Sequence, residues 1–369
     1  MSTPYPTSPE ALTAAWLSAI TGHPVDDFQV AGLGAGVGVI GSVNRVTLRA
    51  PLHTPLHTPL HTPTGPDSLI VKFSSRAPEN RAVALTYDMY RREVHFYREL
   101  AGRVPIRTPH CFAAEYDDAE DEFVLVLEDL RDCRVGDQVA GASLGDAEAV
   151  VDTLGALHAA TWGRALEGVP SHNVPAQRDG IAGGFRMGWP AVVERFPDLI
   201  PADALRRAPV LGDHIGGLID RLTAGPQCLV HADVRLDNVL FPPDRPAGAA
   251  PADGAPILVD WQSVCLCSGE QDLAYFLTQS LPDALRERHL DGLIRRYHDA
   301  LVAGGVSGHD LDACRERFRV AAVYLLAWAV LIAGTLDLGN DRGVALARAL
   351  LGRSLSSVVA LDGFDLLRS

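Results

Sequence analysis

Residues 229–241, LVHADVRLDNVLF, have apolar ends around a strongly polar centre. Apolar ends of this kind are typical of short strands that enter a core. In the centre, His231, Asp233 and Asn238 form the pattern H-x-D-x-x-x-x-N, the spacing of a phosphoryl-transfer catalytic loop. In such a loop the aspartate accepts the proton of the attacking hydroxyl, and the asparagine coordinates a metal ion. Taken alone, the stretch could also be a polar hairpin loop with no catalytic role.

Two later aspartates support the catalytic interpretation. Asp260 ends the apolar strand PILVD, where a kinase-type fold carries its second metal-binding aspartate. Asp272 lies in GEQDLAYFL, at the head of an apolar helix. An aspartate there often binds the backbone of the catalytic loop in this architecture, although helix capping alone would also explain it.

A glycine-rich segment precedes the central part of the chain. Gly36, Gly38 and Gly41 match G-x-G-x-x-G, a weak pattern that dinucleotide-binding folds share. A dinucleotide fold requires a helix after the glycines, whereas SVNRVTLRA is β-branched and alternating and therefore predicts a strand. A glycine loop between two strands is typical of a lid over nucleotide phosphates. The sequence has no GxxxxGK[ST], which excludes a P-loop ATPase.

Lysine occurs once in the chain. Of the 32 basic residues, all but Lys72 are arginine. A coding bias toward arginine explains the general preference, but it would spare lysine where a compact ammonium is needed. Lys72 lies in the predicted strand SLIVKFSS, where a kinase lysine grips phosphates and pairs with a helix glutamate. Glu93 is the favoured partner, and Glu99 is the alternative.

Composition and charge limit the classes of function. The chain has 369 residues, 47% hydrophobic and 21% charged, which is ordinary for a globular protein of two domains or lobes. A net charge of −14 argues against nucleic acid or an anionic membrane as the main partner. The six cysteines form no CxxC pair, and the first residues show no signal-peptide pattern. We therefore expect a reduced, cytoplasmic protein.

The order of predicted elements indicates an α+β fold in two parts. Strand patterns dominate up to about residue 130. Helical patterns dominate after it, at 145–163, 190–222, 281–304 and 309–360. The apolar run 320–336 approaches the length of a membrane span, but its aromatic residues and charged flank favour a buried core helix.

A repeat stands between two predicted strands. Residues 51–62 repeat PLHT three times, which brings His53, His57 and His61 to four-residue spacing. These histidines could bind a metal ion, but a proline at every fourth position forbids a helix, so they need not share a face. The favoured interpretation is a solvated hairpin extension lengthened by repeat slippage.

Six segments carry a resemblance to a known superfamily. In chain order they are REVHFY, LVLEDL, LGALHAATW, HADVRLDN, LVDWQ and GEQDLAYFL, and they cover most of residues 32–280. The chain resembles the aminoglycoside phosphotransferase and choline kinase-like enzymes, most closely their ecdysteroid-kinase-like branch. The resemblance implies a bilobal protein-kinase-like fold. A small nucleotide-binding lobe with an antiparallel sheet would comprise 1–130, and a larger, mainly helical catalytic and substrate-binding lobe would comprise 131–369.

The resemblance also implies roles for further residues. Glu128 to Leu130 would form the hinge whose backbone hydrogen-bonds adenine. His231 would brace the catalytic loop, in which Ala232 departs from the usual glycine. Arg235 would contact the γ-phosphate or the substrate, and a surface ion pair is its alternative role.

The predicted activity is phosphoryl transfer from ATP, with Mg²⁺, to a hydroxyl of a small molecule. Asp233 is the predicted base, Asn238 and Asp260 the metal ligands, and Lys72 the phosphate-binding lysine. Residues 131–222 would build the acceptor site, whose mixed charges and aromatic residues favour a hydroxylated metabolite over an aminoglycoside. A nucleotide-binding pseudokinase or scaffold is the alternative from another class. The preference between ATP and GTP, the oligomeric state and the pathway stay open.

Overall fold

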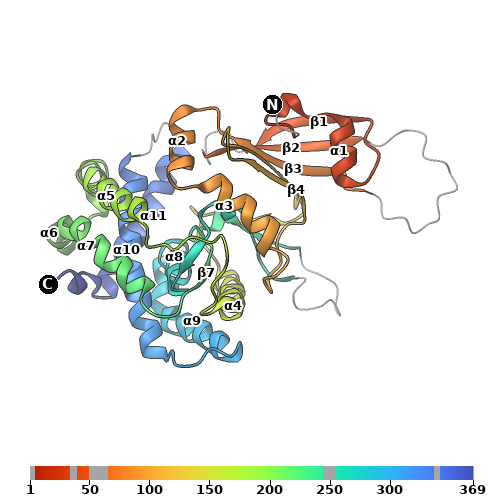
Figure 1. The fold of residues 1–369 in the computed structure, drawn as a ribbon. Coiled ribbons are helices and arrows are strands. Elements are labelled where there is room, and N and C mark those ends of the chain that lie inside the picture. The colour runs from red at the N-terminus through yellow and green to blue at the C-terminus, as the bar shows by residue number, and fades with distance from the viewer. Residues whose placement is uncertain (1–4, 34–39, 50–64, 244–253, 336–340, 369) are drawn as a thin grey trace. The chain divides into compact units, whose positions relative to one another are not determined.

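The computed structural model describes residues 5–33, 40–49, 65–243, 254–335 and 341–368. The chain divides into two compact units. One comprises residues 1–103 and 108–131, and the other comprises 104–107 and 132–369. The first unit has an antiparallel sheet and the second is mainly helical, which confirms the predicted α+β, kinase-like fold class (Figure 1). The nucleotide-binding and substrate-binding roles of the two parts stay predictions.

The first unit is built on a five-stranded antiparallel sheet of order β1-β2-β3-β5-β4. Its strands are β1 (Asp27–Leu33), β2 (Gly41–Arg49), β3 (Ser68–Ser74), β4 (Cys111–Asp117) and β5 (Glu122–Glu128). Its helices are α1 (Ala14–Thr21), α2 (Pro78–Thr86) and α3 (Met89–His95), and the chain continues from α3 into a π-helical turn at Phe96–Leu100. The sequence NRAVALTYDMYRREVHFYREL (80–100) has a helical pattern, but the helix is interrupted at Asp88, whose φ of +55° is left-handed.

The alternation of β3 decides which side chains face each side of this sheet. Leu69, Val71 and Phe73 are buried in one core cluster together with Leu17 of α1. Because successive strand residues point to opposite faces, Lys72 points away from that cluster. The strand pattern therefore delivers the single lysine to the face opposite the α1 core.

The histidine repeat lies outside the described residues, between β2 and β3. These strands pair antiparallel, with Thr47 opposite Ser68, and Leu48 N donates to Asp67 O at 2.8 Å. The strand ends that flank the repeat are therefore adjacent, as the hairpin interpretation expects. The glycine segment likewise stands between two paired strands, since Leu33 of β1 lies opposite Val43 of β2.

Deleting residues 52–63 should leave the unfolding temperature within a few degrees of the parent. The flanking strand ends already meet, and loop length enters the closure entropy only logarithmically, at about 0.6 kcal/mol per doubling. Thermal unfolding followed by circular dichroism, with and without zinc, measures this. A large loss of stability, or a zinc-dependent stability present only in the parent, would show that the histidines act as ligands.

The second unit is a helical assembly with two small sheets. Its helices are α4 (Leu144–Thr161), α5 (Pro175–Arg195), α6 (Ala202–Arg207), α7 (Leu211–Thr223), α8 (Glu270–Ser280), α9 (Asp283–Ala303), α10 (Leu311–Thr335) and α11 (Asp341–Ala360). One sheet pairs β7 (Cys228–Val230) with β10 (Cys265–Cys267), and the other has the order β6-β8-β9, formed by Arg134–Val135, Val239–Phe241 and Ile257–Leu258.

Helix α10 lies at the centre of this unit. It packs against α5, α7, α8 and α11, and Val320 to Leu326 are each at most 2% exposed (Figure 1). Two helical segments, Leu311–Gly334 and Asp341–Ala360, are long and apolar enough to span a membrane by length and composition. The packing of α10 inside the helical unit agrees with the predicted core helix.

Candidate active site

The polar stretch 231–238 forms a loop between two short buried strands. β7 precedes it, and a 3₁₀ turn at Leu236–Asn238 leads directly into β8. Ala232 has a φ of +64°, a left-handed conformation in which glycine avoids the strain of a Cβ. Alanine is strained in this conformation, so here the strain must be offset by contacts.

Asp272 supplies those contacts. Its carboxylate is fully buried and accepts from the backbone N–H of His231 at 2.7 Å and of Ala232 at 2.8 Å. His158 Nε2 lies 3.3 Å from the same carboxylate, and its Nδ1 lies 2.8 Å from the Tyr297 hydroxyl. Hydrogen bonds from two consecutive backbone donors to a carboxylate are strong and directional. Asp272 therefore fixes the loop backbone, and His158 is a buried structural histidine.

Both ring nitrogens of His231 are engaged within the protein. Nε2 lies 2.9 Å from the carbonyl oxygen of Val259, and Nδ1 accepts from Asp233 N at 3.3 Å. The ring is fully buried and contacts Trp261, with ring centroids 4.6 Å apart. These bonds assign the proton to Nε2. His231 thus connects the loop to the segment that carries Asp260, and its geometry suits bracing better than proton transfer.

The Asp233 carboxylate receives a donor on each oxygen. Asn238 Nδ2 donates to Oδ2 at 3.0 Å and also to the Asp233 carbonyl at 3.0 Å, while the Tyr275 hydroxyl donates to Oδ1 at 2.8 Å. Burial raises the pKa of Asp233; the positive charge of Arg235 opposes the rise, and the negative charge of Asp260 adds to it. The Asp233 carboxylate is therefore fixed in orientation and partly desolvated. A general base requires both properties.

Asn238 and Asp260 offer oxygen ligands for a cation near this base. Asn238 O accepts from Val259 N at 3.0 Å, which ties the end of the loop to the residue before Asp260. Asp260 has a φ of +70° and accepts from Gln262 Nε2 at 3.1 Å. Because Asn238 uses its amide nitrogen toward Asp233, its amide oxygen is directed elsewhere. An amide oxygen and a carboxylate are hard ligands of the kind that Mg²⁺ prefers, so these residues fit that ion.

Arg235 lies close to the base without a hydrogen bond to it. Its Nε is 3.9 Å from Asp233 Oδ2, and the side chain is 21% exposed. Within the described ranges, Arg235 Nε is a buried donor that has no hydrogen-bond partner. The nearby Asp233 charge raises the pKa of the guanidinium, which keeps it cationic. A buried cation with an unused donor is suited to receiving an anionic ligand.

The first unit contains the predicted lysine pair. Lys72 Nζ on β3 lies 2.7 Å from both carboxylate oxygens of Glu93 on α3, and the side chains are 10% and 2% exposed. Glu99, the alternative partner, instead faces Arg103 at 3.5 Å on the surface. The structure thus brings Lys72 together with Glu93, as expected from the sequence. Removing one member of a buried pair typically costs about 3–5 kcal/mol.

The structure says less about the other residues that are predicted to bind nucleotide. Gly36 and Gly38 lie outside the described residues, and Gly41 begins β2, where an added Cβ would lie 3.0 Å from Phe73 O. Glu128 ends β5, and its N–H donates to His110 O at 2.8 Å. The adenine contacts of Glu128 and Leu130 stay predictions.

Two residues of this region were not predicted from the sequence. Tyr275 follows Asp272 by three positions on α8, which is the spacing of neighbours on one helix face and could have been noticed. Gln138 is fully buried, and its Oε1 accepts from Leu236 N at 2.7 Å within the loop. The backbone N–H of Gln138 also donates to Asp237 Oδ1 at 3.2 Å. No local pattern indicates Gln138, because its partners lie about a hundred positions away.

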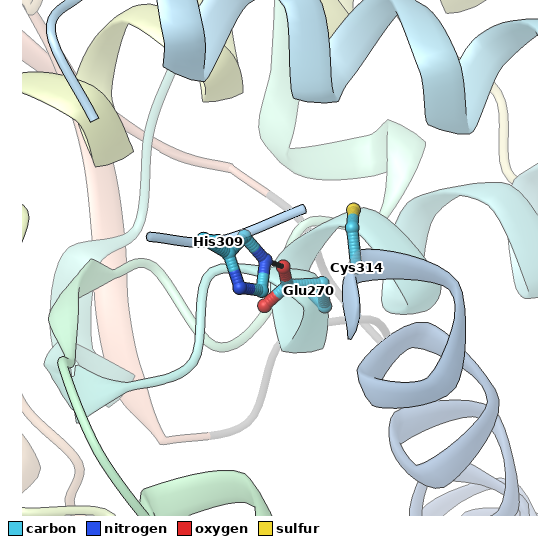
Figure 2. A group of neighbouring side chains, drawn as sticks. All are labelled: Glu270, His309 and Cys314. Atoms are coloured by element: carbon cyan, nitrogen blue, oxygen red, sulfur yellow. Dashed lines mark hydrogen bonds and ion pairs between the residues drawn. The ribbon is translucent and has the colours of Figure 1, made fainter. Parts of the chain in front are cut away.

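Glu270 and Cys314, which are buried, and His309, which is partly buried, form a group of possible metal ligands near the start of α8. Figure 2 shows Glu270, His309 and Cys314, whose ligand atoms lie within 4.8 Å of one another. Glu270 already accepts from the Ser268 hydroxyl, and His309 Nε2 lies 2.6 Å from its other oxygen. Burial and hydrogen bonding to Glu270 raise the pKa of Cys314, which opposes the thiolate that a metal would need. The group is explained as an anchor for the α8 N-terminus, where a carboxylate is favourable.

Comparison with protein families gives one match. The model of the ecdysteroid kinase-like family matches residues 48–168 and 211–304, more than half of the chain. The second segment contains the whole loop with Asp260 and Asp272, and the first contains Lys72 and Glu93. A search of curated proteins found no match.

Solved structures with similar folds are small-molecule kinases by their descriptions. A candidate aminoglycoside phosphotransferase from Ralstonia eutropha has a TM-score of 0.56 at 12% identity, covering 96% of this chain and 97% of its own. A microcompartment-associated aminopropanol kinase has a TM-score of 0.55 at 11% identity, covering 95% and 98%. The GDP complex of aminoglycoside 2′-phosphotransferase-IIIa has a TM-score of 0.51 at 13% identity, covering 94% and 99%. At these identities the likeness establishes the fold.

Proposed function

This chain belongs to the ecdysteroid kinase-like family of small-molecule kinases, and we propose that it transfers the γ-phosphate of ATP to a hydroxyl of a small metabolite. The observation that carries the proposal is the Asp233 carboxylate, held by Asn238 and Tyr275 on a rigid loop beside Asp260. A nucleotide-binding scaffold would need none of this geometry. Lys72, Asp233, Asn238 and Asp260 are all present, whereas pseudokinases typically lose at least one of them.

In this proposal each side chain has a role. Asp233 accepts the proton of the acceptor hydroxyl as the new oxygen–phosphorus bond forms and the bond to the departing ADP oxygen breaks. Asn238 and Asp260 would hold Mg²⁺, which neutralises charge on the transferred phosphate when it is bound. Lys72, oriented by Glu93, would bind the α- and β-phosphates, and the partly exposed Arg235 guanidinium would contact the γ-phosphate.

The charges of the proposed acceptor segment favour an acceptor that is not a polycation. Several of its acidic residues already face arginines: Asp146 with Arg134, Glu148 and Asp152 with Arg296, Asp198 with Arg348, Asp213 with Arg186 and Asp220 with Arg178. An aminoglycoside would require acids that are available to its amines. The paired acids therefore support a hydroxylated metabolite of low positive charge, with an aminoglycoside as the second candidate.

The expectation that apolar side chains of GGFRMGWPAVVERF (183–196) line the acceptor site needs correction. Phe185, Trp189 and Phe196 are 1%, 7% and 4% exposed, so they pack inside the helical unit and do not offer a lining. Met187 of the same stretch is exposed, at 69%. The preference for a metabolite consequently depends on the paired charges. We also propose a cytoplasmic location, because all six cysteines are free thiols.

A screen for ATP consumption tests the proposal. Purified protein is incubated with Mg²⁺-ATP and a library of hydroxylated metabolites and antibiotics, and ADP release is compared with that of Asp233→Asn. We expect at least one hydroxylated metabolite to stimulate ADP release and to gain a phosphoryl group by mass spectrometry. If the protein binds nucleotide but no compound raises ADP release above the variant, the scaffold alternative is favoured.

A further inference from the structure

Helix α8 contacts the catalytic loop through two side chains that lie one helical turn apart. Asp272 holds the backbone N–H groups of His231 and Ala232, and Tyr275, one turn later, holds the side chain of Asp233. Every residue of α8 is buried, so the helix offers these two polar groups from inside the core. One rigid helix thus fixes three consecutive residues of the loop.

The Tyr275 hydroxyl needs a partner where it lies. The residue is 4% exposed, and an unsatisfied buried hydroxyl costs about 1–3 kcal/mol. Among the described residues its hydrogen-bond partner is Asp233 Oδ1, at 2.8 Å. A phenylalanine such as the neighbouring Phe276, which is fully buried, would satisfy the packing without that requirement. Burial and the Asp233 charge raise the pKa of Tyr275 well above its usual range, so the hydroxyl stays a donor at working pH.

Two donors at opposite oxygens determine the plane of the carboxylate. Asn238 Nδ2 binds Oδ2 and Tyr275 binds Oδ1, so rotation about the last side-chain bond would break both. Each oxygen retains a second acceptor direction for the proton of an incoming hydroxyl. If Tyr275 were absent, Asn238 alone would hold the group from one side. Misorientation of a base by about an ångström can cost two orders of magnitude in rate.

We propose that Tyr275 is a positioning residue for phosphoryl transfer, which orients the Asp233 carboxylate toward the acceptor hydroxyl. This inference rests on the proposed function of Asp233. Tyr275 touches neither nucleotide nor acceptor in this role, and it acts through Asp233 alone.

Tyr275→Phe tests the proposal through a separation of kcat from KM. We expect kcat to fall roughly 10- to 100-fold, the worth of one hydrogen bond to a charged group. The KM values for ATP and acceptor should stay within about twofold. The substitution leaves unchanged the interactions that bind the substrates equally in the ground state and the transition state. Tyr324→Phe is the matched control: Tyr324 is fully buried and bonds His172, Gln177 and Trp328, away from the loop. The control should retain kcat.

A double-mutant cycle distinguishes positioning from a general structural effect. In an Asp233→Asn background, Tyr275→Phe should cause no further loss of kcat, because the group it orients is already gone. Two outcomes overturn the proposal: wild-type kcat in Tyr275→Phe, or a loss that multiplies fully with that of Asp233→Asn.

Crystal structures of wild type and Tyr275→Phe give a readout that does not require activity. We expect the Asp233 carboxylate to rotate or to occupy several orientations in the variant. The same single orientation in both proteins would overturn the inference. Failure to find any acceptor would count against the proposed function, while the crystal structures would still decide the role of Tyr275.

Discussion

Asp233→Asn should lower the turnover of phosphoryl transfer by roughly 10²–10⁴, the usual worth of a positioned general base. The amide cannot take up the acceptor proton, but it has nearly the shape of the carboxylate. The backbone of the loop should stay in place, because Asp272 holds the N–H groups of His231 and Ala232 independently of this side chain. Nucleotide affinity should therefore change little.

The measurement is steady-state kinetics on an identified acceptor, with nucleotide binding followed by calorimetry. Asp291→Asn is a suitable control, since Asp291 is an exposed aspartate of the same unit that pairs with Arg315 and lies outside the proposed acceptor segment. The control should retain wild-type turnover. Near-full turnover in Asp233→Asn would mean that another group accepts the proton.

Lys72→Arg should lower kcat/KM for ATP roughly 10- to 100-fold although the charge is kept. The ammonium lies 2.7 Å from both Glu93 oxygens in a site that is about one-tenth exposed, which suits a compact cation. The wider guanidinium would overfill this site and displace the pair. Thermal unfolding should be followed in parallel, so that loss of the fold is separated from loss of nucleotide binding.

The single lysine also allows a direct chemical test of the same role. An amine-directed acylating reagent has two targets, the α-amino group and Lys72. Mg²⁺-ATP should suppress labelling of the Lys72 peptide in mass spectrometry, because bound phosphates would cover Nζ. The N-terminal peptide serves as the internal control and should be labelled equally with and without nucleotide. Labelling of Lys72 that ignores ATP would contradict its role in binding phosphate.

Local spacing explains which features could be predicted from the sequence. Two of these features are short-range signals: the spacing of His231, Asp233 and Asn238, and the alternation around Lys72. Asp272 and Glu93 bind partners that are distant in the sequence, but each lies in a predictable position on a helix. Such signals can be recognised in a single sequence, because the periods of strands and helices determine where side chains point.

Other features depend on packing that no local pattern encodes. Gln138 meets Leu236 only after the chain folds back on itself, and the break at Asp88 lies inside an uninterrupted helical pattern. The segment 190–222 was predicted as helical, but α5 begins at Pro175 and continues through Pro190. Tertiary contacts of α5 with α10 evidently outweigh the helix-breaking tendency of that proline.

The complete burial of α8 has a consequence for the dynamics of the protein. A helix with all eleven residues inside the core cannot open its amide groups to water by local fluctuation. Its backbone hydrogens should exchange with deuterium only as fast as the helical unit unfolds globally. The alignment of the base should therefore persist until the helical unit melts, and heat should abolish the orientation of Asp233 and the helical structure of this unit in a single transition.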